Sequence, residues 1–359
     1  MSTAFEPYRL GDVELKNRIV MAPMTRSRAY GAGATPTDLM TAYYTQRATA
    51  GLIVTEGIQP SIVGQGYPDT PGLHTVEQVA AWRKVTESVH AAGGVVFAQL
   101  MHVGRVGDPD LLPSNQNVVG PSAVAAQGQI YTHAGMKPFS TPHALTEDEI
   151  AGTSADFAHA AANAVEAGFD GVELHGANGY LIHQFLSSNA NVREDQWGGS
   201  AEGRIRFPIE VAAAVAEAIG AERVGIRISP GNPLHDIEEA DLEETYKFLI
   251  AGLVDLDPAY LHIMETDGHR ALTKALRAQW PGTLILNPAT RPRPTGVEDL
   301  VLIEDGTADL LSFGALFLAN PDLPARLAQG GPFNTPDRAT SFGGDHRGYI
   351  DYPTLADQE

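Results

Sequence analysis

The chain has 359 residues, of which 43% are hydrophobic and 19% charged, as is typical of a protein with a sizeable core. Its 44 Asp and Glu against 24 Lys and Arg give a formal net charge of -20, which repels nucleic-acid phosphates and anionic membranes. The absence of cysteine excludes disulfides, thiol nucleophiles and cysteine-bound clusters. The N-terminal sequence lacks a basic flank followed by an apolar stretch, and no apolar run approaches about 18 residues. We therefore expect a cytoplasmic protein, monomeric or homodimeric, with no nucleic-acid or membrane partner.

Short apolar runs alternate with helical patterns along the chain, after a small cover hairpin expected at residues 9–15. The apolar runs predict strands at 17–22, 51–57, 94–100, 171–174, 223–228, 259–264, 283–287 and 308–313. Helices are predicted over 36–50, 75–92, 146–167, 201–219, 239–253, 270–279, 296–304 and 321–329. This alternation favours a (β/α)8 TIM barrel, in which catalytic groups lie at the carboxyl ends of the strands.

Two segments fall outside the alternation. Residues 101–145 form a long excursion after the third strand, rich in Gly, Pro, Ser and Asn. It is too long for a simple connection, so we expect it to lie over the pocket. Residues 331–359 are predicted to form a tail over the barrel. Because no linker separates these parts, we interpret residues 1–359 as a single barrel domain.

A group of polar residues follows the fourth predicted strand. His175 ends the strand, Asn178 comes three residues later, and Tyr180 lies just beyond. A histidine and an amide in this place direct two neutral donors at one oxygen, and the tyrosine reaches the far side of the same substrate. The pattern indicates a site that polarises a carbonyl or nitro group and delivers a proton nearby. An H-x-x-N pair that merely caps a turn is the simpler explanation when the pair is taken alone.

Other strand ends carry Thr25, Gly57, Gln99 and Arg227. A hydroxyl, an amide and a guanidinium on separate strands suit a planar, acceptor-rich ligand that carries negative charge, such as a reduced flavin. Each also has a structural explanation: a turn cap for Thr25, a satisfied core amide for Gln99, and an acidic partner for Arg227. The sequence contains no glycosidase-like carboxylate pair and no metal-ligand motif, so we expect no metal.

Eight motifs, in order, resemble those of the old yellow enzyme family of flavin-dependent ene-reductases. They are N-R-I-V-M-A-P-M-T-R (17–26), G-Y-P-D-T-P-G (66–72), F-A-Q-L-M-H-V-G-R (97–105), H-G-A-N-G-Y-L-I-H-Q-F-L-S (175–187), R-E-D-Q-W-G-G-S (193–200), G-I-R-I-S-P (225–230), A-N-P-D-L (319–323) and G-Y-I-D-Y-P (348–353). The resemblance spans almost the whole chain and implies an enzyme that contains FMN and oxidises NAD(P)H. The family members that hold an iron-sulfur centre are excluded, because the chain has no cysteine.

The resemblance implies a flavin site formed by Pro23, Met24, Thr25, Gly57, Gln99, His175, Arg227 and Gly314. The Thr25 hydroxyl is expected at the O4 edge of the ring and Gln99 at its pyrimidine edge, while Gly57 lets the ring approach closely. Arg227 is expected beside the N1/O2 edge, where negative charge accumulates on reduction.

The resemblance also implies the residues that act on the substrate. His175 and Asn178 hold the activating oxygen, and Tyr180 protonates the α-carbon after the β-carbon has received a hydride. Tyr67 and Met101 shape the substrate pocket. Tyrosine suits the role of acid because its reference pKa of about 10 keeps it protonated at neutral pH.

Two departures from the family pattern lie at the expected phosphate site. Relatives have a glycine-rich turn after strand seven, where this chain has Pro288, which lacks an N–H. Relatives also have a Gly-Arg pair after strand eight, where Gly314 is followed here by Ala315. Loss of a guanidinium weakens phosphate binding, and Arg291 and Arg293 are predicted to supply the missing charge. A deazaflavin cofactor and weak retention of FMN are the alternatives.

The sequence thus predicts a reductase of activated alkenes, such as enones, enals, imides or nitroalkenes, with FMN as cofactor and NAD(P)H as reductant. Reductive attack on nitrate esters or nitroaromatics by the same site is one alternative. Another is a non-catalytic barrel that only binds a ligand, an interpretation supported solely by the altered phosphate site.

Overall fold

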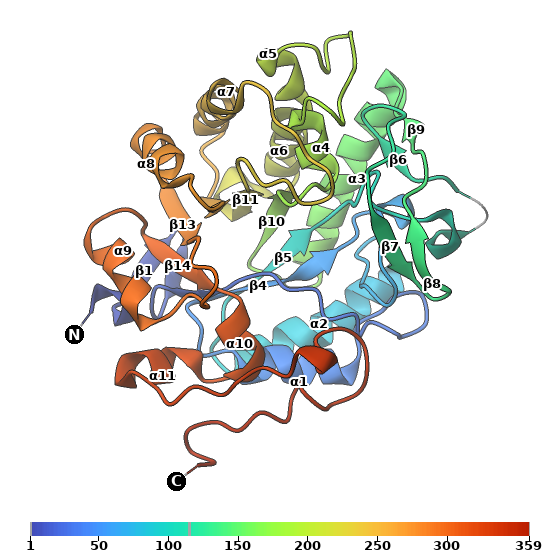
Figure 1. Ribbon diagram of the computed structural model, residues 1–359. Helices are drawn as coiled ribbons and strands as arrows, with labels where there is room; N and C mark the ends of the chain where they lie inside the picture. The colour runs from blue at the N-terminus through green and yellow to red at the C-terminus, as the bar shows by residue number, and fades with distance from the viewer. Residues whose placement is uncertain (1, 114–115, 359) are drawn as a thin grey trace.

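The computed structural model describes residues 2–113 and 116–358, and its centre is a closed barrel of parallel strands surrounded by helices (Figure 1). Each strand pairs with its neighbours in chain order, so the (β/α)8 fold expected from the alternation is confirmed. The barrel strands are β3 (Ile19–Met21), β4 (Leu52–Ile58), β5 (Val96–Leu100), β10 (Gly171–Gly176), β11 (Val224–Ile228), β12 (Tyr260–Met264), β13 (Thr283–Asn287) and β14 (Leu310–Phe313).

The helices lie outside the barrel and follow the strands (Figure 1). They are α1 (Asp38–Gln46), α2 (Val76–Ala91), α3 (Glu147–Glu166), α4 (Leu181–Leu186), α5 (Ala201–Arg204), α6 (Arg206–Ile219), α7 (Leu242–Val254), α8 (Arg270–Gln279), α9 (Val301–Glu304), α10 (Ala315–Ala319) and α11 (Leu323–Gln329). At the start of α3 the Thr146 hydroxyl accepts the Glu149 N–H, and Glu149 accepts the Thr146 N–H, forming a capping box.

Several predicted helices have different limits. The helix expected over 36–50 begins only at Asp38, because Thr37 has the extended backbone of an N-cap residue. The stretch 296–304 is a 3-10 turn, Val297–Leu300, followed by α9. Asp299 accepts the Gly296 N–H and so tightens this first turn. The stretch 201–219 is divided into α5 and α6, and α10 was not predicted.

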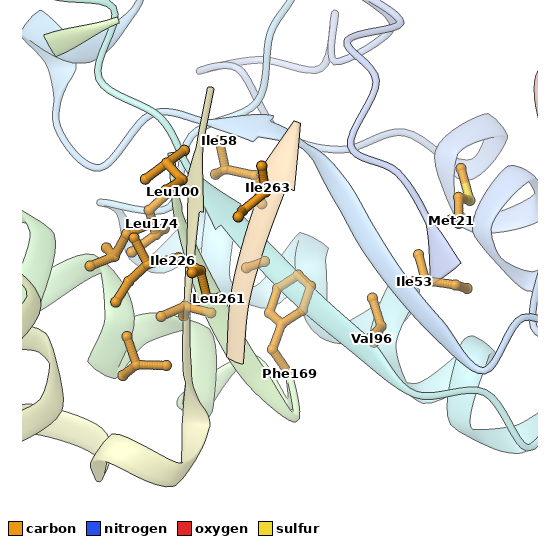
Figure 2. Packing of buried hydrophobic residues seen from close by; sticks show 14 of the residues in the cluster. Met21, Ile53, Ile58, Val96, Leu100, Phe169, Leu174, Ile226, Leu261 and Ile263 are labelled. Carbon is orange, nitrogen blue, oxygen red and sulfur yellow. The ribbon is translucent and has the colours of Figure 1, made fainter. Parts of the chain in front are cut away.

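Two apolar layers stabilise the barrel. The outer layer packs strand residues against the helices, and Figure 2 shows part of it, including Val96, Phe169 and Leu174. The inner layer lies at the amino ends of the strands and includes Val20, Leu52, Phe97, Tyr260 and Ile285. The cover hairpin of β1 (Tyr8–Leu10) and β2 (Val13–Leu15) adds Leu10 and Leu15 to this layer. The hairpin therefore closes the end of the barrel opposite the expected site.

The excursion after β5 contains short strands that pair with one another. These are β6 (Val119–Gly120), β7 (Gln129–Thr132), β8 (Gly135–Pro138) and β9 (His143–Ala144). The antiparallel pair β7 and β8 projects to one side of the barrel (Figure 1). Phe139, which follows β8, packs against the small apolar cluster that includes Met101 and Tyr180, so part of the excursion reaches the mouth of the barrel.

The C-terminal tail is fixed by buried arginines. The Arg26 guanidinium donates to the Ser341 carbonyl at 2.9 Å, and Arg28 donates to that of Asp345 at 3.1 Å. Tyr349 stacks on Tyr43 of α1, with ring centroids 4.2 Å apart. The tail thus packs against α1 and against the segment that follows β3 (Figure 1).

Helix α2 offers a matched test of the outer layer. Trp82 is 0% exposed, packs 5.3 Å from the Phe169 ring and donates to the Gly72 carbonyl, whereas Val76 on the same helix is 77% exposed. Trp82→Ala is expected to lower the free energy of unfolding by about 3–5 kcal/mol through the cavity it leaves. Val76→Ala is expected to change it by less than about 0.5 kcal/mol. Denaturant unfolding of both variants measures the difference, and equal effects would contradict the packing described.

Candidate active site

Strand pairing places two predicted site residues next to each other. In the parallel register of β10 and β11, His175 lies opposite Arg227. Both side chains are buried. Because side chains alternate along a strand, Glu173 shares the inward face of β10 with His175. The barrel interior near its mouth is therefore polar, although the strands read as largely apolar runs.

His175 is a neutral imidazole in this environment. Burial, followed by the positive charge of Arg227, holds its pKa well below the ordinary value for histidine. Its Nδ1 atom has no hydrogen-bond partner among the residues described by the structure. Arg227 donates to the Asn287 Oδ1 atom at 3.2 Å, and its buried Nε also lacks a partner within the described chain. Buried polar atoms of this kind normally have partners, so both nitrogens point to a ligand.

Asn178 is held in a fixed turn after β10. It has a left-handed backbone with φ 57°, and its N–H donates to the Ser229 Oγ atom at 2.9 Å. Its side-chain oxygen accepts from Asn232 Nδ2 at 2.9 Å, which leaves its amide N–H groups available for a ligand. Neither Ser229 nor Asn232 was predicted from the sequence. The Gly/Asn/Pro composition of residues 231–233 marks a turn but not the residue that it supports.

Tyr180 is the N-cap residue of α4, and its ring lies 5.0 Å from that of His175, measured between centroids. Its hydroxyl is 3.1 Å from the Tyr67 hydroxyl. Tyr67 and Met101 pack with Tyr180 in one small apolar cluster, so the predicted substrate residues lie together. Met101 also restricts position 57 to glycine, since a Cβ at Gly57 would lie 2.5 Å from the Met101 sulfur.

A buried polar layer inside the barrel was missed by the sequence analysis. The Glu173 carboxylate accepts from Gln99 Nε2 at 2.8 Å, from the Tyr260 hydroxyl at 3.1 Å and from His262 Nδ1 at 2.8 Å. Burial raises the pKa of Glu173, but His262, Arg227 and Gln99 together bring it below its ordinary value. Gln99 is therefore bonded within the barrel. The sequence signal for this layer was the presence of a charged residue within two otherwise apolar strands, Glu173 in β10 and Arg227 in β11.

The segment after β3 carries the other predicted flavin contacts. Pro23, Met24 and Thr25 are partly buried, and a Cβ at Gly314 would lie 3.6 Å from the Met24 sulfur. Behind this segment, the buried Glu56 carboxylate accepts the Arg26 N–H at 3.3 Å and the Tyr44 hydroxyl at 3.1 Å. Glu56 thus fixes the backbone next to Thr25.

A cavity of about 510 Å³ lies at the carboxyl ends of β12, β13 and β14. Its lining includes Met264, Asn287, Pro288, Arg291, Gly314 and Ala315. Arg291 is thus placed at the cavity, whereas the Arg293 guanidinium is bonded to Asp299 at 2.6 and 2.8 Å. The Ala289 N–H, which follows Pro288, donates to the Glu265 carboxylate at 3.0 Å. Glu265 is also paired with Arg270.

The two ends of this site differ in how well they fit a flavin. At the ring end, the unpartnered nitrogens of His175 and Arg227 match the acceptor-rich edge of an isoalloxazine. At the phosphate end, Ala315 carries no charge and the Ala289 N–H is already bonded to a carboxylate. The residues present therefore fit the ring, while Arg291 is the cation that lines the cavity at the phosphate end.

A barrel with neutral donors and a guanidinium at its mouth defines an oxidoreductase built around a planar, acceptor-rich cofactor. Comparison with known proteins agrees with this class. The sequence profile of the NADH:flavin oxidoreductase / NADH oxidase family matches residues 3–334. The chain belongs to this family, which includes old yellow enzyme, and is a flavin-dependent oxidoreductase.

Individual relatives match over nearly their whole length. 12-oxophytodienoate reductase 1 of Oryza sativa subsp. japonica is 41% identical over 361 residues, which cover 97% of this chain and 92% of the relative. A probable flavin mononucleotide-dependent alkene reductase of Leishmania infantum is 40% identical, with coverage of 98% and 97%. The solved structure of morphinone reductase in complex with tetrahydroNAD superposes with a TM-score of 0.91 at 42% identity, with coverage of 98% and 97%.

Two features are absent from residues 2–113 and 116–358. No helix there is long and apolar enough to cross a membrane. No group of three or more His, Asp or Glu side chains in these ranges is arranged to hold a metal ion.

Glu56 is expected to make the free energy of unfolding depend on pH. Burial is the largest cause that raises its pKa from 4.5 to about 7. Since the unfolded chain ionises first, the free energy of unfolding is expected to fall as pH rises between these values, by about 3 kcal/mol from this group. Glu56→Gln should remove this decline, whereas Glu87→Gln, at an exposed position on α2, should keep it. Denaturant unfolding across this pH range tests the prediction, and an unchanged slope in Glu56→Gln would refute it.

Proposed function

We propose that the protein reduces the C=C bond of alkenes activated by a carbonyl, imide or nitro group, with NAD(P)H as reductant. The observation that carries the proposal is the neutral, unpartnered His175 beside Asn178 and Tyr180. The printed names of the relatives, an alkene reductase and a 12-oxophytodienoate reductase, support the same substrate class. The complex of morphinone reductase with tetrahydroNAD supports a nicotinamide as reductant.

In this proposal, His175 and Asn178 bind the activating oxygen of the substrate. Both are neutral donors, so they stabilise negative charge on that oxygen by hydrogen bonds and without transfer of a proton. The bond from Asn232 fixes the Asn178 amide with its N–H groups toward the ligand. The chemistry that a bound flavin supplies is transfer of a hydride, taken from NAD(P)H, to the β-carbon of the alkene.

Tyr180 is proposed to donate the proton that the α-carbon requires. Burial raises the pKa of its hydroxyl, although the bond with Tyr67 partly opposes this, so the group is protonated at neutral pH. Met101 and Tyr67 enclose it on the apolar side, which excludes water from the reacting carbon.

Tyr180→Phe removes the proposed acid and leaves the ring in place. The rate of reoxidation of the reduced enzyme by 2-cyclohexenone is expected to fall by about 100-fold or more, whereas flavin reduction by NADPH stays close to the wild-type rate. Stopped-flow measurement of the two half-reactions separates these effects. Tyr131→Phe, on the exposed part of β7, is the matched control. Equal losses in both half-reactions would count against the role of Tyr180.

The proposal includes a cation for the cofactor phosphate. Arg291 is the proposed direct contact, because it lines the cavity near Gly314 and Ala315. Arg293, which is paired with Asp299 and Glu298, is proposed to add charge from a greater distance. The Ala289 N–H is already bonded to Glu265, and a flavin with a different phosphate arrangement, such as a deazaflavin, is the alternative cofactor.

Titration of FMN and of riboflavin into protein freed of cofactor tests this assignment, because the two ligands differ only in the phosphate. Arg291→Ala is expected to weaken FMN binding by about tenfold, the value of a charge-assisted bond, and to leave riboflavin binding unchanged. Arg293→Ala is expected to have a smaller effect of the same kind. Unchanged FMN affinity in both variants would rule out compensation by these arginines.

A further inference from the structure

A chain of polar contacts continues from Tyr180 away from the substrate position. The Tyr180 hydroxyl lies 3.1 Å from that of Tyr67, which lies 3.4 Å from the Nε2 atom of His235. The Nδ1 atom of His235 is 2.6 Å from the Asn178 carbonyl oxygen. His235 belongs to the loop between β11 and α7 and is partly buried. Its backbone has φ 60°, and Asp236 follows with φ 62°, so both residues have a left-handed backbone conformation that few non-glycine residues adopt.

The partner of Nδ1 determines the state of the His235 ring. A carbonyl oxygen only accepts, so Nδ1 carries the proton of this bond. In the neutral imidazole Nε2 is then an acceptor, and it accepts a hydrogen bond from the Tyr67 hydroxyl. Tyr67 in turn accepts from Tyr180. With neutral His235, therefore, the Tyr180 proton is directed toward Tyr67 and away from the substrate.

Protonation of His235 reverses this order. Both ring nitrogens then donate, so Nε2 donates to the Tyr67 oxygen and Tyr67 donates to the Tyr180 oxygen. The Tyr180 proton is freed for the substrate. The same side chains thus have two hydrogen-bonding arrangements, and the charge on one ring selects between them.

We propose that His235 is a positioning residue that acts through Tyr67 to direct the Tyr180 hydroxyl at the substrate and to return a proton to it after each turnover. The inference rests on the proposed role of Tyr180 as proton donor. When the α-carbon takes the Tyr180 proton, a C–H bond forms and the Tyr180 O–H bond breaks. Tyr67 then gives its proton to Tyr180, His235 Nε2 gives its proton to Tyr67, and a proton taken up from the solvent restores the charged form of His235.

The groups around His235 set the pH range in which this occurs. Burial is the largest cause that lowers its pKa, Arg105 and His183 lower it further, and the bond to the Asn178 carbonyl opposes them. Arg105 donates to the His235 and Asp236 carbonyls and is paired with the Asp236 carboxylate.

Other side chains complete the surroundings of His235. His183 is paired with Glu239, and the ring of Phe139 meets His235 edge to face. His175 and the two tyrosines complete the surroundings. Protonated His235 is therefore expected to increase as pH falls below the ordinary range of histidine.

His235→Asn separates the relay from the support of the loop. The amide of Asn takes the place of Nδ1 and keeps a donor for the Asn178 carbonyl, but it has no atom in place of Nε2. Tyr67→Phe interrupts the same chain at its centre and does not disturb the loop. His143→Asn, at an exposed histidine that is bonded to Glu149 at the start of α3, is the matched control.

The measurement is the rate of the oxidative half-reaction with 2-cyclohexenone as a function of pH, on the flavin-loaded protein. In the wild type the rate is expected to rise as pH falls through the pKa of His235. His235→Asn and Tyr67→Phe should lose this dependence and react about 10-fold to 100-fold more slowly, with flavin reduction by NADPH unchanged. Nitrogen NMR of histidine-labelled protein should detect the Nδ1–H tautomer and the titration of His235 without any turnover.

The outcomes distinguish the relay from the function on which it rests. If His235→Asn keeps the wild-type rate and pH profile while Tyr180→Phe is slow, the relay is wrong and the role of Tyr180 stands. If Tyr180→Phe is as fast as the wild type, the proposed proton donor is wrong and the relay falls with it. An Nε2–H tautomer in the neutral protein would also overturn the relay.

Discussion

The parallel register between β10 and β11 is the constraint on which the site depends. It sets His175 opposite Arg227, and two residues earlier in β10 it sets Glu173 opposite Gly225. A Cβ at Gly225 would clash with the Tyr260 ring, which bonds to Glu173. Because side chains alternate in a strand, a slip of one residue would turn all of these groups out of the barrel. The polar interior is therefore fixed by backbone pairing and not by flexible loops.

The charges in this interior have separate tasks. Burial, followed by the positive charge of Arg227, keeps the neighbouring His175 neutral, and the Glu173 carboxylate partly offsets the effect of burial on the pKa of Arg227. Buried charges are retained at a cost in stability unless they are paired and bonded, and here the bonds from Gln99, Tyr260 and His262 satisfy Glu173. A neutral histidine beside a fixed cation suits a site where negative charge appears transiently on a substrate and on a cofactor ring.

Prediction from the sequence succeeded where a local pattern determines the structure. The alternation of strands and helices fixed the barrel, and the T-x-x-E pattern at Thr146 fixed the start of α3. The pattern after the fourth strand placed His175 and Tyr180 near one another, whereas Tyr67 and Met101 were placed with them only through the family resemblance. The polar layer around Glu173 and the contact of His235 with Tyr67 depend on residues far apart in the chain. Pairing at such a distance leaves no periodic signal, so these contacts required the structure.

The proposed function depends on a flavin ring at the mouth of the barrel, so the presence of that ring is the central claim. The absorbance spectrum of the purified protein, with the mass of its released chromophore, tests this most directly. The account predicts the absorption bands and the mass of a flavin, or a shift of the bands of added FMN when the protein is isolated without cofactor. A colourless protein that leaves the spectra of both added FMN and added riboflavin unchanged would contradict it.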